Sequence, residues 1–254
     1  MNLLISTFWL SRRAFMESVR QPWLEIGNLF IPLFFFAVTV GAIGSLRDNF
    51  GVDNFIAFQM PVAVLQGVAG VAGSAGLGMT QDIQRGYFDK LRLTSAPPFA
   101  IVLGRMASDG FRALILTLIV VVVGLLFGTG MEAGVFGAAF IVLLGGLFGL
   151  SYSGIGMAIA LRTGSPQAAQ AGFLLFFPLL FLSESFVPKE FYAGWLEFLA
   201  TINPVTYVLQ GMRALTMDGW QWMAVTKSLI SVAGIGALTM GLATMAARWR
   251  FKGA

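Results

Sequence analysis

The uncharged stretch FIAFQMPVAVLQGVAGVAGSAGLGM, residues 55–79, decides the fold of this chain. None of its residues is Asp, Glu, Lys or Arg. About 20 helical residues, rising 1.5 Å each, cross the roughly 30 Å hydrocarbon core of a bilayer. Because lipid offers no hydrogen bonds to the backbone, a helix is the only state expected at this length. Residues 55–79 therefore predict a transmembrane helix.

Further uncharged stretches of similar length occur along the chain. They are residues 28–45, 113–131, 133–161, 163–183 and 228–247. The composition agrees, since 57% of the 254 residues are hydrophobic and only 11% are charged. Soluble domains are about 25% charged, and they need that polar surface to cover their core. We expect an all-α integral membrane protein with six transmembrane helices, forming one domain over residues 1–254.

Lys and Arg are divided unevenly between the two sides of these predicted helices. With the N-terminus placed in the cytoplasm, the inner residues are Arg12, Arg13, Arg20, Arg85, Lys90, Arg92, Arg105, Arg112, Arg162, Arg248, Arg250 and Lys252. The outer residues are Arg47, Lys189, Arg213 and Lys227. Positive residues accumulate in cytoplasmic loops, so we expect a multi-pass plasma-membrane protein with both termini inside. The basic balance then indicates contact with anionic lipid rather than with nucleic acid.

The N-terminal residues 1–24 precede the first long apolar run and have a mixed pattern. Leu4, Ile5, Phe8, Phe15, Met16 and Val19 share one half of a helical wheel. Arg12 falls among them and would have to extend its charge toward water. This pattern predicts an interfacial helix on the inner leaflet, and a frayed cytoplasmic extension is the alternative.

Several chemistries are excluded by residues that the sequence lacks. Without Cys or His, thiol catalysis, disulfides and thiolate or imidazole metal sites are impossible. The chain also has no phosphate-binding G-x-x-x-x-G-K-[ST] loop, so we expect no catalytic residue, no metal and no cofactor bound by this chain. The predicted spans contain no ionisable residue, which argues against an ion-coupled carrier. Any transport would need energy from another protein.

Glycine recurs three residues apart in the second predicted span, at Gly67, Gly70, Gly73 and Gly76. Small residues allow helices to approach closely within a membrane. The row indicates either ordinary packing within the chain or a face that slides at a subunit interface. The sequence leaves both possibilities open.

The stretch TQDIQRGYFDKLRLTSAPPFAIVLGR, residues 80–105, interrupts the apolar spans with charge on the cytoplasmic side. On a helical wheel Ile83, Tyr87, Phe88 and Leu91 form an apolar stripe. The opposite face holds Asp82, Arg85, Asp89 and Arg92, with Gly86 and Lys90 in the same segment. This pattern fits a surface helix stabilised by neighbouring charges, or a docking element for a cytoplasmic partner.

Residues 184–222 have neither a loop composition nor a clean apolar pattern. Aromatic residues gather there, as they do at membrane–water boundaries. Asn203 followed by Pro204 is a typical start of a helix, with a capping residue before a proline. We expect a short re-entrant or interfacial pair of helices on the outer face.

Two motifs resemble those of a known family. DIQRGYFDKLRLTSAPPFAIVLGR is similar to the cytoplasmic signature of ABC-2 type permeases, and FPLLFLSESFVP followed by GWLEFLATINPVTYVLQGMRAL resembles their fifth span and outer segment. The resemblance covers essentially the whole chain and is nearest to daunorubicin-resistance-type permeases. Two features depart from it: the doubled Pro97-Pro98 comes later than in the family, and Glu184 stands where a neutral residue is expected.

The resemblance implies the permease subunit of an ATP-binding cassette exporter, with two cytoplasmic ATPase subunits, a second permease copy or paralogue, and membrane lipids as partners. ATP and Mg would be bound by the ATPase, docked on the coupling segment at residues 81–98. The cargo would be an amphipathic drug, a lipid or a glycolipid or polysaccharide. Alternatives are a non-transporting membrane scaffold and a secondary carrier.

The resemblance also implies two further sets of residues. The expected substrate path is Phe34, Phe35, Phe36, Gln66, Phe176 and Phe177. The expected outer gate is Glu184, Asn203 and Pro204.

Overall fold

The computed structural model describes residues 3–43, 54–94, 97–186, 188 and 191–252. These residues form helices joined by short turns, and none of them lies in a strand. Five of the described helices are long and apolar enough to cross a membrane. They are α2 (Pro22–Ile43), α3 (Phe55–Gln84), α5 (Pro98–Leu126), α6 (Gly134–Thr163) and α12 (Trp222–Lys252).

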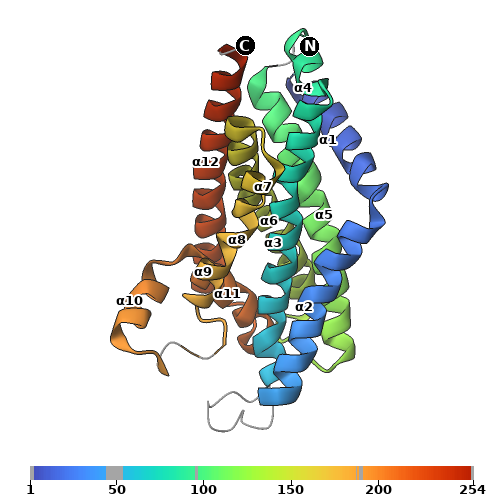
Figure 1. Cartoon of the computed structure of the whole chain (residues 1–254). Coiled ribbons are helices and arrows are strands. Elements are labelled where there is room, and N and C mark those ends of the chain that lie inside the picture. The colour runs from blue at the N-terminus through green and yellow to red at the C-terminus, as the bar shows by residue number, and fades with distance from the viewer. Residues whose placement is uncertain (1–2, 44–53, 95–96, 187, 189–190, 253–254) are drawn as a thin grey trace.

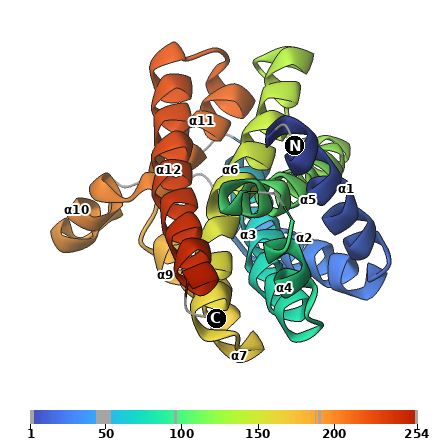
Figure 2. The same ribbon diagram turned by 90° about the horizontal axis from the view of Figure 1, so that it is seen from above.

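Helix α3 lies inside the bundle, with α2 and α5 on one side and α6 on another (Figures 1 and 2). Its apolar residues are buried along nearly the whole length, because neighbouring helices cover it on several sides. Small residues make this possible. A Cβ added to Gly76 would come 2.7 Å from the carbonyl oxygen of Gly156 in α6. Gly67, Gly70 and Gly73 also contact other helices of the same chain, which supports packing within the chain as the reason for the glycine row.

The fifth predicted span, residues 163–183, is not one long helix. Three short helices follow one another there: α7 (Pro166–Ala169), α8 (Ala171–Leu174) and α9 (Phe176–Phe181). Pro178 has no backbone N–H to donate to Leu174, which weakens a continuous helix at this point. The apolar segment Pro166–Phe181 is also shorter than the five long helices. The described part of the chain therefore has five long helices where the sequence predicted six spans.

The third predicted span, residues 113–131, is placed differently in the structure. Helix α5 begins at Pro98 and ends at Leu126, so it includes residues that the sequence assigned to the cytoplasmic segment. Its first half contains Arg105, Asp109 and Arg112, all buried. Arg105 pairs with Asp82 of α3, and Arg112 pairs with Glu25 of α2 and with Asp109 of α5 itself. All three charges precede residue 113, outside the third predicted span, so the expectation of spans free of ionisable residues stays a prediction.

Shorter helices lie toward both ends of the bundle. Helix α1 (Leu3–Val19) occupies most of residues 1–24, predicted as an N-terminal interfacial helix, and the chain bends before α2 begins at Pro22. Near the other end of the bundle lie α10 (Gly194–Ile202), α11 (Pro204–Arg213) and a π-helical turn at Ala214–Asp218. Asn203 caps α11, since its Oδ1 accepts a hydrogen bond of 3.0 Å from Val205 N. The predicted helix start at Asn203-Pro204 is confirmed.

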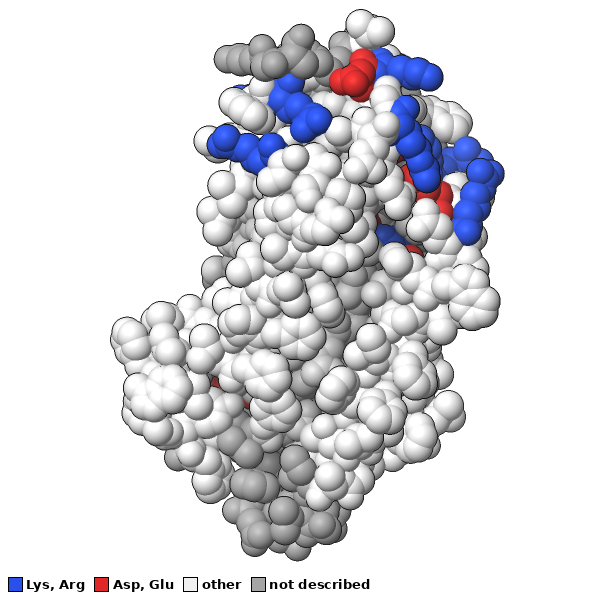
Figure 3. All heavy atoms as spheres, in the orientation of Figure 1, with Lys and Arg blue, Asp and Glu red and all other residues white. Residues whose placement is uncertain are grey.

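The N-terminus, the C-terminus and the short helix α4 (Tyr87–Arg92) lie at the same end of the bundle (Figure 1). Lys and Arg gather at this end in the view of Figure 3, whereas the described residues in the lower part of that face are almost all uncharged. We call it the charged end, and the end near α10 and α11 the opposite end. Of the four residues predicted outside, Arg47 and Lys189 lie outside the described residues.

Candidate functional site

An apolar cavity of about 380 Å³ lies between α2, α3 and the α8–α9 segment. In Figure 1, α2 lies on one side of α3, and α8 and α9 lie on the other side. Most of the wall is aromatic or aliphatic, including Phe173, Phe177 and Phe181. Small-molecule sites are usually concave and apolar, about 300–1,000 Å³ in volume, with a few polar groups that orient the ligand. The cavity has the size and the walls of such a site.

Two amide groups supply the polar part of this cavity. Asn28 of α2 and Gln59 of α3 both line it. Asn28 Nδ2 and Gln59 Nε2 are buried and have no hydrogen-bond partner among the described residues. A buried donor without a partner is costly, by about 1–3 kcal/mol. The two amides could therefore donate hydrogen bonds to a polar group of an otherwise apolar ligand.

The cavity brings together part of the predicted substrate path. The predicted residues that line it are Phe35, Phe36, Gln66 and Phe177. Phe34 does not line it and is 52% exposed on another face of α2. Phe176 points into the bundle, with its ring centroid 5.5 Å from that of Tyr152. Contact of these residues with a substrate remains a prediction.

The sequence analysis did not assign several residues of the cavity to a substrate path. They are Asn28, Gln59, Phe173, Phe181 and Phe186 among others. The members on α2 repeat every three or four residues, from Asn28 through Pro32 and Phe35 to Thr39. Such spacing marks one face of a helix and could have indicated them. The contribution of Phe186 depends on how the chain folds back after α9, which no local pattern shows.

The predicted coupling segment is not one continuous helix. Helix α3 continues to Gln84, and the chain turns at Gly86 in the left-handed conformation, with φ of 67°, before α4 begins at Tyr87. Glycine adopts this conformation without the steric cost of a side chain. The turn changes the direction of the chain, so a single helical wheel does not describe residues 82–92.

Several residues predicted to face a partner instead face the bundle. Phe88 is 1% exposed and stacks on Phe251 of α12, with ring centroids 5.3 Å apart. The guanidinium carbon of Arg13 lies over the ring of Tyr87, 3.6 Å from the centroid of that ring. Ile83 and Leu91 are half-buried against the same inner cluster as Phe88. The apolar stripe therefore anchors α4 to its own bundle, and contact of these residues with an ATPase remains a prediction.

Only some of the described residues in the predicted coupling segment are exposed. Arg85, Asp89 and Lys90 are exposed, and Leu93 just after α4 is 90% exposed. The side chain of Arg92 lies outside the described residues. Sequence analysis did not single out Leu93, whose exposure follows from the turn at Gly86 and the anchoring of Phe88. Single exposed apolar residues are common on protein surfaces, so a contact of Leu93 with a partner remains a prediction.

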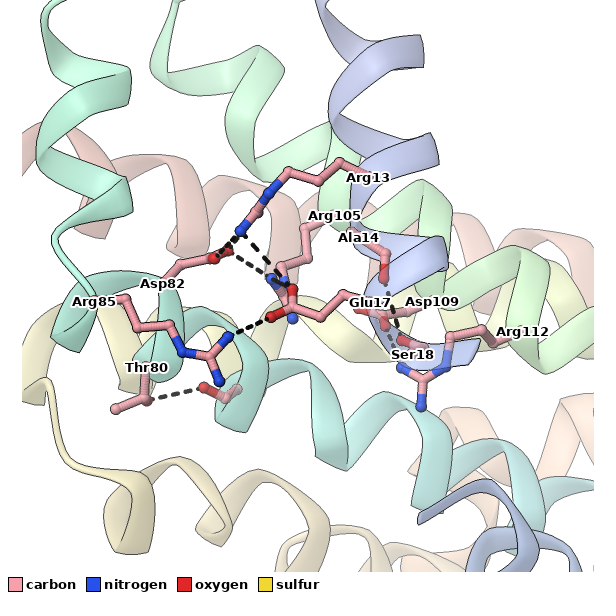
Figure 4. A network of polar contacts seen from close by, with 11 residues as sticks. Arg13, Ala14, Glu17, Ser18, Thr80, Asp82, Arg85, Arg105, Asp109 and Arg112 are labelled. Atoms are coloured by element: carbon pink, nitrogen blue, oxygen red, sulfur yellow. Dashed lines mark hydrogen bonds and ion pairs between the residues drawn. The ribbon is translucent and has the colours of Figure 1, made fainter. Parts of the chain in front are cut away.

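Asp82, also predicted to face a partner, is buried at the centre of an ion-pair network (Figure 4). Its Oδ2 accepts a hydrogen bond of 2.7 Å from Arg105 Nη1 of α5. Its Oδ1 accepts one of 2.7 Å from Arg13 Nη2 of α1. Burial alone would lower the pKa of Arg13, but the hydrogen bond and charge of Asp82 outweigh it and raise that pKa. The carboxylate thus joins three helices, α1, α3 and α5.

The network extends from Asp82 in two directions. Glu17 of α1 accepts a hydrogen bond of 3.1 Å from Arg85 Nη1. Deeper in the bundle, Arg112 Nη1 donates to Asp109 Oδ1 at 2.8 Å, and Nη2 donates to Ser74 Oγ and pairs with Glu25. The four arginines of the network are Arg13, Arg85, Arg105 and Arg112, and its four carboxylates are Glu17, Glu25, Asp82 and Asp109. Its formal charge is therefore balanced.

Of the predicted outer-gate residues, Glu184 lies near a second buried charge, Arg213. Its Nε donates a hydrogen bond of 3.1 Å to the carbonyl oxygen of Phe58, and its guanidinium lies 3.5 Å from the centroid of the Phe58 ring. Glu184 is 8% exposed and accepts a hydrogen bond of 2.7 Å from Gln210 Nε2. Asn203 Nδ2 donates to the carbonyl oxygen of Leu179 at 2.5 Å. These contacts tie α11 to α3 and to the end of α9.

Comparison with known proteins places the chain in a family. The profile of the ABC-2 type transporter family matches residues 6–217. A daunorubicin resistance ABC transporter permease protein of Streptomyces coeruleorubidus is 26% identical over 237 residues, covering 91% of this chain and 83% of that protein. The "Probable doxorubicin resistance ABC transporter permease protein" of Mycobacterium tuberculosis is 23% identical over 231 residues, covering 90% and 83%.

The fold and these matches define a class, the membrane subunits of transporters whose ATPase resides on separate subunits. The chain belongs to the ABC-2 type transporter family. Membership implies ATPase subunits as partners, and it identifies the chain as a multi-pass membrane protein.

Proposed function

We propose that this chain is the permease subunit of an ATP-binding cassette exporter that moves an amphipathic drug or lipid outward. The cavity between α2, α3 and α9 carries this proposal, because it combines aromatic walls with two unpartnered amide donors. Its volume of about 380 Å³ suits a small amphipathic molecule better than a polysaccharide chain. The names of the two relatives refer to daunorubicin and doxorubicin resistance, which also supports a small amphipathic cargo.

The charged end of the bundle would lie in the cytoplasm, with both termini inside. The support is the accumulation of Lys and Arg at this end, since positive residues favour the cytoplasmic side. The segment Pro166–Phe181 would provide a sixth crossing together with its flanking residues. Helices α10 and α11 would then form the outer re-entrant pair, with Glu184, Asn203 and Pro204 near the outer gate.

ATPase subunits would dock on the exposed surface made by Arg85, Asp89, Lys90 and Leu93. Helix α4 is fixed to α12 through Phe88 and Phe251, and Tyr87 contacts Arg13 of α1. A displacement of this surface by the ATPase would therefore be transmitted to α1, α3, α5 and α12 together. Two ATPase subunits and a second permease copy or paralogue would complete the transporter, with ATP and Mg bound by the ATPases.

Two neighbouring phenylalanines allow a matched test of the cavity. Phe35 lines the cavity and Phe34 does not, although both are on α2 and each is 52% exposed. We expect Phe35→Ala to weaken the stimulation of ATPase activity by amphipathic drugs or phospholipids about tenfold in half-maximal concentration. An aromatic contact of roughly 1–1.5 kcal/mol accounts for that change. The measurement is ATPase activity of the complex that co-purifies with the tagged chain, reconstituted in liposomes.

Phe34→Ala is the control, and its response should match that of the unaltered chain. Equal responses of Phe35→Ala and Phe34→Ala would contradict the assignment of this cavity to the cargo. Complete absence of a co-purifying ATPase would favour the alternative of a membrane scaffold.

A further inference from the structure

A basic groove lies at the charged end, outside both the cavity and the interior of the ion-pair network. Its volume is about 700 Å³, and it is lined by Arg12, Arg13, Met16, Glu17, Arg20, Gln21 and Arg85. The groove follows the second half of α1 and reaches the turn between α3 and α4. Four arginines therefore face a single carboxylate in this groove.

The arginines of the groove are not equally neutralised. Arg13 and Arg85 pair with Asp82 and Glu17. Arg12 and Arg20 are exposed, and neither forms an ion pair with any described residue. The guanidinium of Arg12 lies 5.7 Å from the centroid of the Trp9 ring, a cation–π geometry that leaves its N–H groups free to bind. The groove thus has two guanidinium groups available to an anion.

The outer face of α1 shows which medium surrounds these arginines. Phe8 is 61% exposed, Met16 42% and Val19 54%, and Arg12 lies on the same face, one helical turn from Phe8 and one from Met16. Trp23, in the first turn of α2, is 83% exposed. A contiguous row of exposed apolar side chains needs an apolar cover, and α1 leads directly into the long apolar helix α2. Hydrocarbon on this row would place Arg12 and Arg20 at the depth of the lipid headgroups.

We propose that this groove binds the phosphate of an anionic phospholipid, held by Arg12 and Arg20. Guanidinium groups bind phosphate through charge-assisted, often bidentate, hydrogen bonds. The acyl chains of the lipid lie along Phe8, Met16, Val19 and Trp23. The bound lipid holds the elbow between α1 and α2 against the membrane surface, beside the network that positions α4.

An acidic segment of a partner protein would match the charge of the groove but not the exposed apolar residues beside it. Such a segment would leave the row from Phe8 to Val19 uncovered, whereas a phospholipid covers charge and row at once. The arginines of the groove and the apolar row beside them together favour a phospholipid as the occupant.

The test compares two double variants that remove the same charge from the same end. Arg12→Gln with Arg20→Gln alters the groove, and Arg162→Gln with Arg248→Gln alters two exposed arginines outside it. The full-length protein is reconstituted in phosphatidylcholine bilayers that contain traces of spin-labelled phosphatidylglycerol or spin-labelled phosphatidylcholine. Electron paramagnetic resonance then gives the relative association constant of each labelled lipid.

We expect the unaltered chain to prefer phosphatidylglycerol, and the groove variant to lose that preference by at least about fivefold, the contribution of one arginine near an anionic membrane surface. The control variant should retain it. A charge-retaining variant, Arg12→Lys with Arg20→Lys, should keep most of the preference and also shows that the site tolerates substitution.

Three results would overturn the proposal. Equal loss in the groove and control variants would mean that total charge, rather than this groove, selects the lipid. Displacement of the labelled lipid by inorganic phosphate at constant ionic strength would assign the groove to free phosphate. Unchanged lipid preference together with loss of the co-purifying ATPase in the groove variant would assign it to a protein partner.

Discussion

The two ends of the bundle both bury arginine, but they satisfy it in different ways. At the charged end Arg13 and Arg105 share the carboxylate of Asp82, within a network of balanced charge. At the opposite end Arg213 donates to the backbone carbonyl of Phe58 and lies on the ring of the same residue. The first arrangement joins separate helices through side chains. The second fixes one helix to the start of another through the backbone.

This difference suggests different roles for the ends. Ion pairs between side chains can exchange partners when helices shift, and the network includes the helices nearest α4. Backbone acceptors offer no such exchange, so α11 is held in one position. Burial raises the pKa of Tyr192, whose hydroxyl donates to the carbonyl oxygen of Ser183 at 2.7 Å at this same end. The opposite end is thus held by contacts to backbone carbonyls, and the charged end by contacts between side chains.

The largest expected effect comes from Asp82→Asn, which breaks the network at its centre. Arg13 and Arg105 would keep their charges and lose their shared carboxylate. Removing one partner from a buried ion pair costs about 3–5 kcal/mol. A protein of this size should then lose roughly 10 °C in apparent melting temperature, measured by tryptophan fluorescence of the detergent-purified chain.

Asp89→Asn removes the same charge from an exposed position on α4 and is the control. It should change the melting temperature by no more than about 1–2 °C, as surface substitutions usually do. Similar melting temperatures for the two variants would show that Asp82 does not hold the three helices together.

An intermediate effect is expected from Arg213→Met at the opposite end. The carbonyl oxygen of Phe58 would lose its donor, and Glu184 would lose a nearby positive charge. Leaving such buried groups unsatisfied costs about 1–3 kcal/mol. Addition of Glu184→Gln should recover part of the loss, because it removes a buried negative charge that Arg213 no longer attracts. The same thermal measurement on the single and double variants checks this, and an additive loss would contradict coupling between the two residues.

The smallest effect on stability is expected from Leu93→Ser. The informative measurement for this variant is therefore its association with the ATPase. Leu93 is 90% exposed, so its replacement should leave the melting temperature unchanged. If an ATPase docks there, its association with the permease should weaken at least about fivefold, since an interface anchor contributes more than roughly 1 kcal/mol. Titration of the ATPase that co-purifies with the unaltered chain measures this.

Leu126→Ser is the matched control, because Leu126 is 81% exposed at the C-terminal end of α5, away from α4. Unaltered ATPase association in Leu93→Ser would remove α4 from the docking surface. It would also remove the main functional reason for placing the charged end in the cytoplasm.

The sequence predicted the features that depend on local composition. Long uncharged runs located the cores of α2, α3, α6 and α12, and Asn203 with Pro204 located the start of α11. It failed where helices depend on distant partners. Helix α5 extends back to Pro98 because its charges have partners on other helices, and no window of sequence contains those partners. The break of the fifth predicted span into α7, α8 and α9 was also missed, although Pro178 was visible.

The candidate site was predictable to a similar degree. The aromatic residues of α2 and α9 were candidates from sequence, but which of two adjacent phenylalanines faces the cavity depends on the rotation of each helix within the bundle. The wheel drawn for residues 82–92 assumed one straight helix. The turn at Gly86 and the stacking of Phe88 on Phe251 removed that assumption.

By itself the sequence determined that this is an all-helical membrane protein with its Lys and Arg biased to one side, because hydrophobicity and charge act along each segment without reference to the others. Only the tertiary structure decided which side chains face inward. Asp82 and Arg13 are 69 positions apart, and Arg213 and Phe58 are 155 apart. Contacts over such distances form only when the helices pack, and that packing is what turns a charged segment into a network and a few phenylalanines into a cavity.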